Sequence, residues 1–175
     1  MFKKKSAYVL PVVVLLFLSL ITTASTVGTR VDAQDSGKTQ QQTVYIHTIQ
    51  SENGKLSITA DEINWYQGAD ADRVFAERDP EGAAEIGGAP DGYYVVNDVD
   101  TLTTYPIADN ATVTMQIYDH TGNIDDLDIQ WNEAITLQQF IDQFNNTEIL
   151  DLSQFPYHFT IQDGVITSIV QQYIP

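Results

Sequence analysis

Two turn dipeptides, Asn53-Gly54 and Asp163-Gly164, constrain the fold of this chain more than any other feature. Each lies between two runs of β-branched and aromatic residues, which favour strands. Asn-Gly and Asp-Gly accept the positive φ angles that a two-residue hairpin turn requires. The sequence therefore predicts two β-hairpins, and the second should place Ile161 opposite Ile166.

The segments between the hairpins add strands and helices. Further strands are predicted at 93–96, 102–107 and 111–118, where apolar and polar residues alternate. Thr136 is a plausible N-cap for a helix over 137–144, whose apolar residues share one face. Within 69–84 the composition favours a helix, but Pro80 and Gly82 should limit it to two turns.

These elements predict a mainly β (α+β) fold. We expect a small, partly closed antiparallel β-barrel or a curved sheet, with one packed amphipathic helix and one short helix. An OB-like barrel belongs to this class, but pattern alone does not give the strand order.

The first 33 residues resemble a secretory signal. Three lysines at 3–5 precede an apolar run at 9–21, and small residues at 22–24 and 31–33 offer two cleavage sites. The alternative is an uncleaved anchor, since 7–24 approaches the roughly 20 residues of a membrane span. Polar residues 34–42 then predict a flexible spacer, and 43–175 a single β-rich domain. We expect this domain to be secreted or held at the outer face of the cytoplasmic membrane.

Composition excludes several classes of protein. The chain has no cysteine, which rules out disulfides, thiol nucleophiles and cysteine-bound metal sites. Its formal net charge of -16 would repel a phosphate backbone, so no nucleic-acid partner is predicted. Contact with a membrane is expected only through the N-terminal segment, if that segment is not cleaved.

Asp61 and Glu62 are the candidate catalytic residues. A glycosidase needs two carboxylates that face each other, and the neighbouring Trp65 could stack on a sugar ring. The alternative is that Trp65 belongs to the core and that both acids are solvated.

Calcium is the only inorganic partner that the sequence suggests. Asp119, Asn123 and Asp125 supply oxygen atoms, which hard cations prefer, at short spacing in an acidic turn. The segment is not an EF-hand, because glycine falls fourth and Gln130 occupies the twelfth position. As a plain acidic hairpin turn the segment needs no metal, which is the favoured interpretation, and no other cofactor is predicted.

Four stretches together resemble an uncharacterised family of small secreted proteins from Gram-positive bacteria. These are 65–71 (WYQGADA), 93–97 (YYVVN), 102–106 (LTTYP) and 171–175 (QQYIP). The resemblance places Val96 and Thr103 where the family often has arginine, so a basic ligand-facing patch is not expected here. The candidate ligand-binding residues, which lie in these stretches, are Trp65, Tyr94, Asn97 and Tyr105.

The sequence thus favours an exported, acidic, non-catalytic domain. We expect it to work as a binding or accessory module, with an extracellular ligand or a component of the cell envelope as its partner. The alternative is a small extracellular hydrolase that uses carboxylates to act on glycans.

Overall fold

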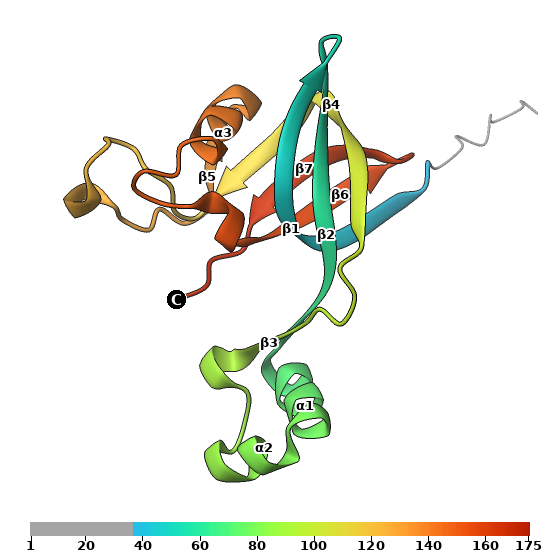
Figure 1. Cartoon of the computed structure of the whole chain (residues 1–175), viewed down its shortest axis with the longest axis vertical. Helices are drawn as coiled ribbons and strands as arrows, with labels where there is room; N and C mark the ends of the chain where they lie inside the picture. Colours follow the sequence, from blue (N-terminus) through green and yellow to red (C-terminus); the bar gives the residue numbers. More distant parts are fainter. Residues whose placement is uncertain (1–36) are drawn as a thin grey trace, which may run out of the picture. The chain divides into compact units, whose positions relative to one another are not determined.

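A computed structural model describes residues 37–175 (Figure 1). The predicted signal segment, its cleavage sites and the alternative anchor lie outside these residues. The strands are β1 (Thr39–Glu52), β2 (Lys55–Gln67), β3 (Tyr93–Val96), β4 (Leu102–Met115), β5 (Glu133–Ile135), β6 (Pro156–Gln162) and β7 (Val165–Gln171). The α-helices are α1 (Gly68–Arg78), α2 (Pro80–Ile86) and α3 (Leu137–Phe144), and short 3-10 helices lie at Pro90–Gly92 (η1), Ile124–Asp126 (η2) and Leu152–Gln154 (η3). In this part of the chain, no helix is both long enough and apolar enough to cross a membrane.

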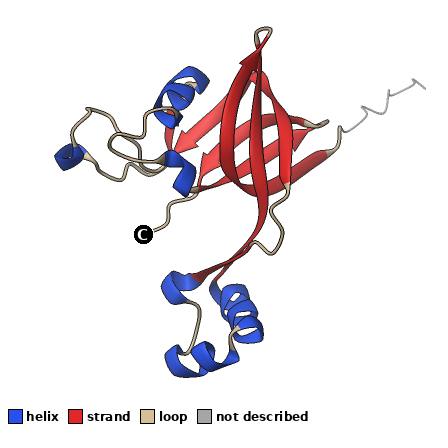
Figure 2. Ribbon diagram, in the orientation of Figure 1, coloured by secondary structure: helices blue, strands red, loops and turns tan. Residues whose placement is uncertain are grey.

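Five strands close into a barrel, in the order β1-β2-β4-β7-β6 and back to β1 (Figure 2). Four of these pairs are antiparallel, and β4 and β7 run parallel. This five-stranded arrangement, with a helix before the fourth barrel strand, has the topology of an OB-type barrel. The predicted β-rich fold class is confirmed, but the barrel is closed and mixed rather than partly open and antiparallel. Residue periodicity does not reveal strand direction, which is why the parallel pair was not predicted.

Both predicted hairpins are confirmed. Asn53 and Gly54 have φ angles of 52° and 77°, and Asp163 and Gly164 have φ angles of 51° and 82°. Ile161 lies opposite Ile166 as expected, next to a bulge in the β6–β7 pair. The turn chemistry therefore fixes the register of four of the five barrel strands.

Strand β1 begins at Thr39, inside the segment that the sequence predicts to be a flexible spacer. Its first residues pair with β6, from Thr39 opposite Gln162 to Tyr45 opposite Pro156. Backbone hydrogen bonds to β6 hold this polar segment in the sheet, so the prediction of a spacer is wrong from Thr39 to Gln42. Alternate residues of a strand share a face, so Gln40 and Gln42 lie on the same face of β1 as Val44, which is buried in the core.

Strand β4 replaces the two strands predicted at 102–107 and 111–118. Its first part pairs with β2, up to Pro106 opposite Ser57. Its second part pairs with β7, and the register shifts between Ile107 and Thr112. Residues 108–110, which include the polar Asp109 and Asn110, separate the two predicted strands and instead mark the place where β4 changes its partner.

Helix α3 begins and ends where the sequence predicts. Thr136 and Gln139 form a reciprocal capping box at its start. Phe140 is fully buried, and its ring centroid lies 5.7 Å from that of Tyr157 in the barrel core. The helix therefore packs against the barrel through the predicted apolar face.

The region predicted as one two-turn helix forms two helices instead. Helix α1 runs through Arg78, and Asp79 then caps α2 by accepting a hydrogen bond of 2.9 Å from the Gly82 backbone N–H. Pro80 ends α1 as expected, but it also occupies the first turn of α2, where a missing N–H costs nothing. Pro80, which the sequence predicts to end a helix, therefore also begins the next one.

Candidate functional site

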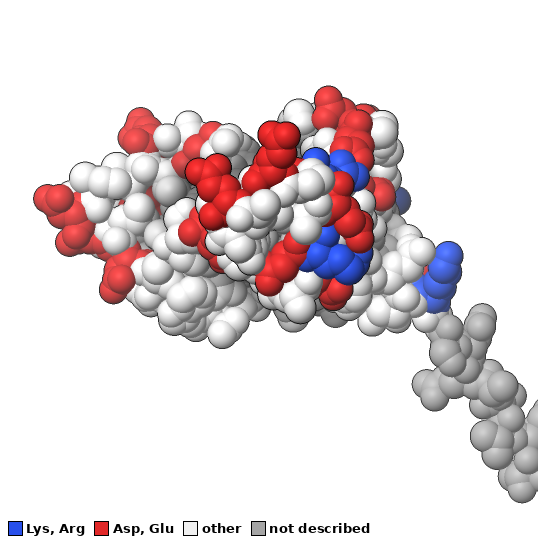
Figure 3. Space-filling model, turned by 90° about the horizontal axis from the view of Figure 1, so that it is seen from below, with Lys and Arg blue, Asp and Glu red and all other residues white. Residues whose placement is uncertain are grey.

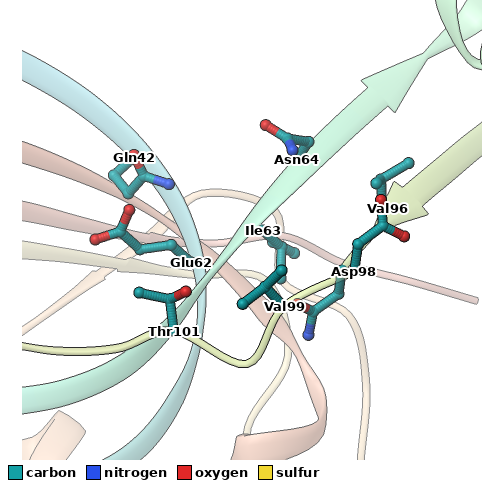
Figure 4. Close-up of a pocket in the computed structure, with 9 residues that line it drawn as sticks. Gln42, Glu62, Ile63, Asn64, Val96, Asp98, Val99 and Thr101 are labelled. Atoms are coloured by element: carbon teal, nitrogen blue, oxygen red, sulfur yellow. The ribbon is translucent and has the colours of Figure 1, made fainter.

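The main candidate site is a polar groove at one mouth of the barrel, made of two adjoining pockets that share Gln42 and Glu62. The first pocket has a volume of about 370 Å³ and the second about 440 Å³. The first is lined by Gln42, Glu62, Ile63, Asn64, Val96, Asn97, Asp98, Val99 and Thr101, and the second by Gln40, Gln41, Gln42, Glu62, Tyr105 and Ile161. We call this combined site the Glu62 groove. Figure 4 shows its first pocket, in which the side chains of Gln42 and Glu62 approach each other from β1 and β2.

Glu62 is positioned by the alternation of strand β2. It shares a face with Ile58 and Ala60, both fully buried, so its side chain lies where the barrel interior opens to solvent. The hydroxyl of Tyr105 donates a hydrogen bond to Glu62 Oε1. Among the described residues, Oε2 has no hydrogen-bond partner. One carboxylate oxygen is therefore held in place, and the other is open to a ligand.

Tyr105 connects Glu62 to the core. Its ring meets Phe159 edge to face, with centroids 6.2 Å apart, and Phe159 is fully buried. Burial raises the pKa of Tyr105 to about 12, and its hydrogen bond to Glu62 acts in the same direction. The phenol is therefore protonated near neutral pH, which makes it a permanent donor to Glu62.

Asp61 has a structural role instead of facing Glu62. It is 6% exposed, and its Oδ1 accepts a hydrogen bond of 2.9 Å from the Thr101 backbone N–H. Its Oδ2 accepts one of 2.6 Å from Asn97 Nδ2. Consecutive residues of a strand point to opposite faces, so Asp61 and Glu62 do not form the facing pair that the sequence analysis proposed. Asp61 instead fastens the β3–β4 loop to β2.

The structure brings together only some of the predicted ligand-binding residues. Asn97 and Tyr105 line the Glu62 groove. Trp65 stacks on Tyr93, with centroids 4.6 Å apart and planes at 13°, where β2 continues past the barrel to pair with β3. Tyr94 packs against Phe75 of α1 and lines a different pocket. Trp65 and Tyr94 therefore join the barrel extension to α1 and β3 and take no part in the groove.

Two of the three calcium candidates use side-chain oxygens to hold their own turn. Asp119 is buried, and its Oδ1 accepts hydrogen bonds from the backbone N–H groups of Thr121 and Gly122, at 3.0 and 2.6 Å. Asn123 accepts a hydrogen bond of 3.2 Å from the Asp125 backbone N–H. No group of three or more His, Cys, Asp and Glu side chains within residues 37–175 is placed to hold a metal. The Asp119 carboxylate and the Asn123 amide oxygen thus stabilise the turn itself.

A second cluster of titratable groups braces the end of β4 against β5. Glu133 Oε1 accepts a hydrogen bond of 2.9 Å from the Tyr118 hydroxyl, and Oε2 lies 2.9 Å from His120 Nε2. Burial acts to raise the pKa of Glu133, but its hydrogen bonds to His120 and Tyr118 outweigh it, so the pKa is lowered. Because both carboxylate oxygens are occupied, this cluster serves the fold.

The electrostatic character of the groove is acidic. No Lys or Arg follows Arg78 in the sequence, and none lines either pocket. At the rim, Arg78 donates two hydrogen bonds of 2.7 and 2.6 Å to Asp98 and lowers the pKa of that carboxyl. Figure 3 shows acidic side chains spread over one face of the molecule, with the few basic ones next to acidic ones. A positively charged group would meet little repulsion in the groove.

Sequence reasoning missed Gln40 and Gln42 as site residues, because their polar stretch was interpreted as a spacer. The signal that could have found them is alternation, since Gln40, Gln42 and Val44 continue one strand face.

No family model, curated protein or solved structure matches this chain. The family resemblance given above therefore stays a prediction.

Proposed function

We propose that this protein is a non-catalytic binding module that works outside the cytoplasmic membrane, either secreted or held at its outer face. The signal-like order of basic and apolar residues at the N-terminus supports export. The small barrel with a polar groove at its mouth supports binding, because barrel mouths are common places for ligands. The partner is an extracellular molecule or a component of the cell envelope.

The groove suits a ligand that carries a cationic amine. The observation that supports this is the open Oε2 of Glu62, whose Oε1 is held by Tyr105 and whose neighbour across the groove is Gln42. A unit charge pair at 4 Å contributes about 4 kcal/mol near a protein surface before desolvation is subtracted. The Gln42 amide offers such a ligand a further hydrogen-bonding group in the same pocket.

The alternative of a glycan hydrolase has weaker support. A two-carboxylate mechanism needs facing acids, one of which has a raised pKa. Asp61 points away from Glu62, and the other acid of the first pocket, Asp98, has a lowered pKa because Arg78 binds it. Neither residue offers the proton that the leaving group would need.

Calorimetric titration with cadaverine and with the uncharged pentanediol tests the proposed ligand class. We expect saturable binding of the amine only, which weakens with added salt as the charges are screened. Glu62→Gln should abolish binding, whereas Glu52→Gln, an exposed acid at the β1–β2 turn, should leave it unchanged. Equal binding of both compounds, or unchanged binding by Glu62→Gln, would contradict the assignment. Release of sugar from a glycan by the intact protein would favour the hydrolase.

A further inference from the structure

Trp131 is an exposed aromatic residue outside the Glu62 groove. It is one of two tryptophans in the chain and lies just before β5, with 64% of its surface exposed. Its ring meets that of Tyr173 edge to face, with centroids 5.5 Å apart and planes at 79°. Tryptophan is among the residues enriched at binding hot spots, which makes this exposed indole a candidate contact for a ligand.

The turn that carries Trp131 is held by one buried residue, Gln116. Gln116 is 6% exposed, and its backbone oxygen accepts a hydrogen bond of 2.8 Å from the Gln130 N–H. Its side-chain Oε1 accepts one of 2.9 Å from the Asn132 N–H. Gln116 thus holds the residues on both sides of Trp131, and Asn132 adopts a positive φ of 60°. A ligand that binds there would lose little affinity to ordering the loop.

The pocket beside Trp131 has no Lys, Arg, Asp or Glu in its wall. Its volume is about 260 Å³, and the polar groups that line it include the amides of Asn132 and Gln172 and the ring of His158. The His158 ring is fixed from both sides, by Thr43 Oγ1 at 3.0 Å and by Gln172 Oε1 at 3.1 Å. In a chain with 24 acidic residues, a pocket wall without an acid favours an uncharged ligand.

We propose that the Trp131 pocket binds a neutral glycan. The flat apolar face of a pyranose ring would stack on the exposed indole of Trp131. Its hydroxyls would hydrogen bond to the amide of Asn132 and to the second hydrogen of Gln172 Nε2, whose first is donated to the Tyr173 backbone oxygen. The pocket shares no lining residue with the Glu62 groove, so the two sites are separate. The proposal stands even if the Glu62 groove binds no amine.

Fluorescence and calorimetric titrations with maltohexaose, cellohexaose and chitohexaose test the proposal. We expect at least one of these sugars to bind, to shift the tryptophan emission, and to bind equally at low and high salt because no ion pair forms. Trp131→Ala should weaken binding by about tenfold or more, which corresponds to about 1.4 kcal/mol. Trp131→Phe should keep part of the affinity but lose the emission change, since only Trp65 would remain.

The controls separate this site from the fold and from the groove. Val99→Ala removes an exposed apolar side chain of the Glu62 groove and should leave sugar binding unchanged. Gln172→Ala provides a second variant at the pocket, should Trp131→Ala fail to fold by circular dichroism. The proposal is overturned if none of the three sugars binds, if binding disappears at high salt, or if the folded pocket variants bind as the wild type does. Glu62→Gln should leave sugar binding intact, so the two proposals fail separately.

Discussion

Replacing Asp61 by alanine should destabilise the domain by about 3 kcal/mol. The change removes two hydrogen bonds to a carboxylate, from Thr101 N–H and Asn97 Nδ2, and each such bond contributes about 1.5 to 3 kcal/mol. We expect a value near the lower end of the sum, because Thr101 and Asn97 are themselves exposed and water can replace Asp61 as their partner. In urea, with a slope of about 2 kcal/mol/M, the unfolding midpoint should fall by about 1.5 M.

Matched variants separate this hydrogen-bonding role from a general effect of charge. Asn97→Ala removes one of the two bonds and should cost about half as much. Asp100→Ala removes an exposed acid from the same loop and should change the midpoint little. A loss below about 1 kcal/mol for Asp61→Ala, or an equal loss for Asp100→Ala, would refute the view that Asp61 fastens this loop.

Three further changes test the fold. Phe140→Ala should cost about 3 to 5 kcal/mol in urea unfolding, because it empties a fully buried position beneath α3. Thr136→Ala removes the cap that accepts the Gln139 N–H and should cost about 1 kcal/mol by the same measurement; an unchanged midpoint would contradict the capping box. Glu133→Gln should lower the free energy of unfolding at neutral pH, because it removes the carboxylate that binds His120 and whose pKa is lowered. That stabilisation is present above the ordinary pKa of glutamate and is lost as the pH falls through the lowered value, so the two proteins should converge in acid; a pH-independent difference would argue against it.

Local chemistry made the hairpins and α3 predictable. Asn53-Gly54 and the Thr136 cap act within a few residues, so their effect can be read directly from the sequence. The closure of the barrel depends instead on which distant strands meet, and β4 pairs with β7 in a direction that no local pattern encodes. The same limit explains why Gln42, held in the sheet only by its pairing with β6, was interpreted as a spacer.

The site was predicted only in part, for a related reason. Glu62 was a candidate as one of two adjacent carboxylates and Tyr105 through the family resemblance, and the structure joins them by a hydrogen bond between strands β2 and β4. Asp61 was paired with Glu62 because the two are adjacent in sequence, although adjacency in a strand separates side chains. Trp131 was not predicted to be a site residue, although it lies in a polar segment, where an aromatic side chain has few apolar neighbours in sequence to pack against.

The way in which the barrel closes also determines when the domain can become complete. The first half of β1 pairs with β6, and the second half of β4 pairs with β7. Both pairs therefore need the β6–β7 hairpin, which comes last in the domain. During synthesis from the N-terminus, the β1–β2 and β2–β4 pairs can form early. The edges of β1 and β4 stay unpaired until β6 and β7, which ends at Gln171, have been made. A chain that lost this hairpin would be an open sheet prone to edge-to-edge association. Folding of the intact chain must wait for its last strand, which places it among the slower topologies.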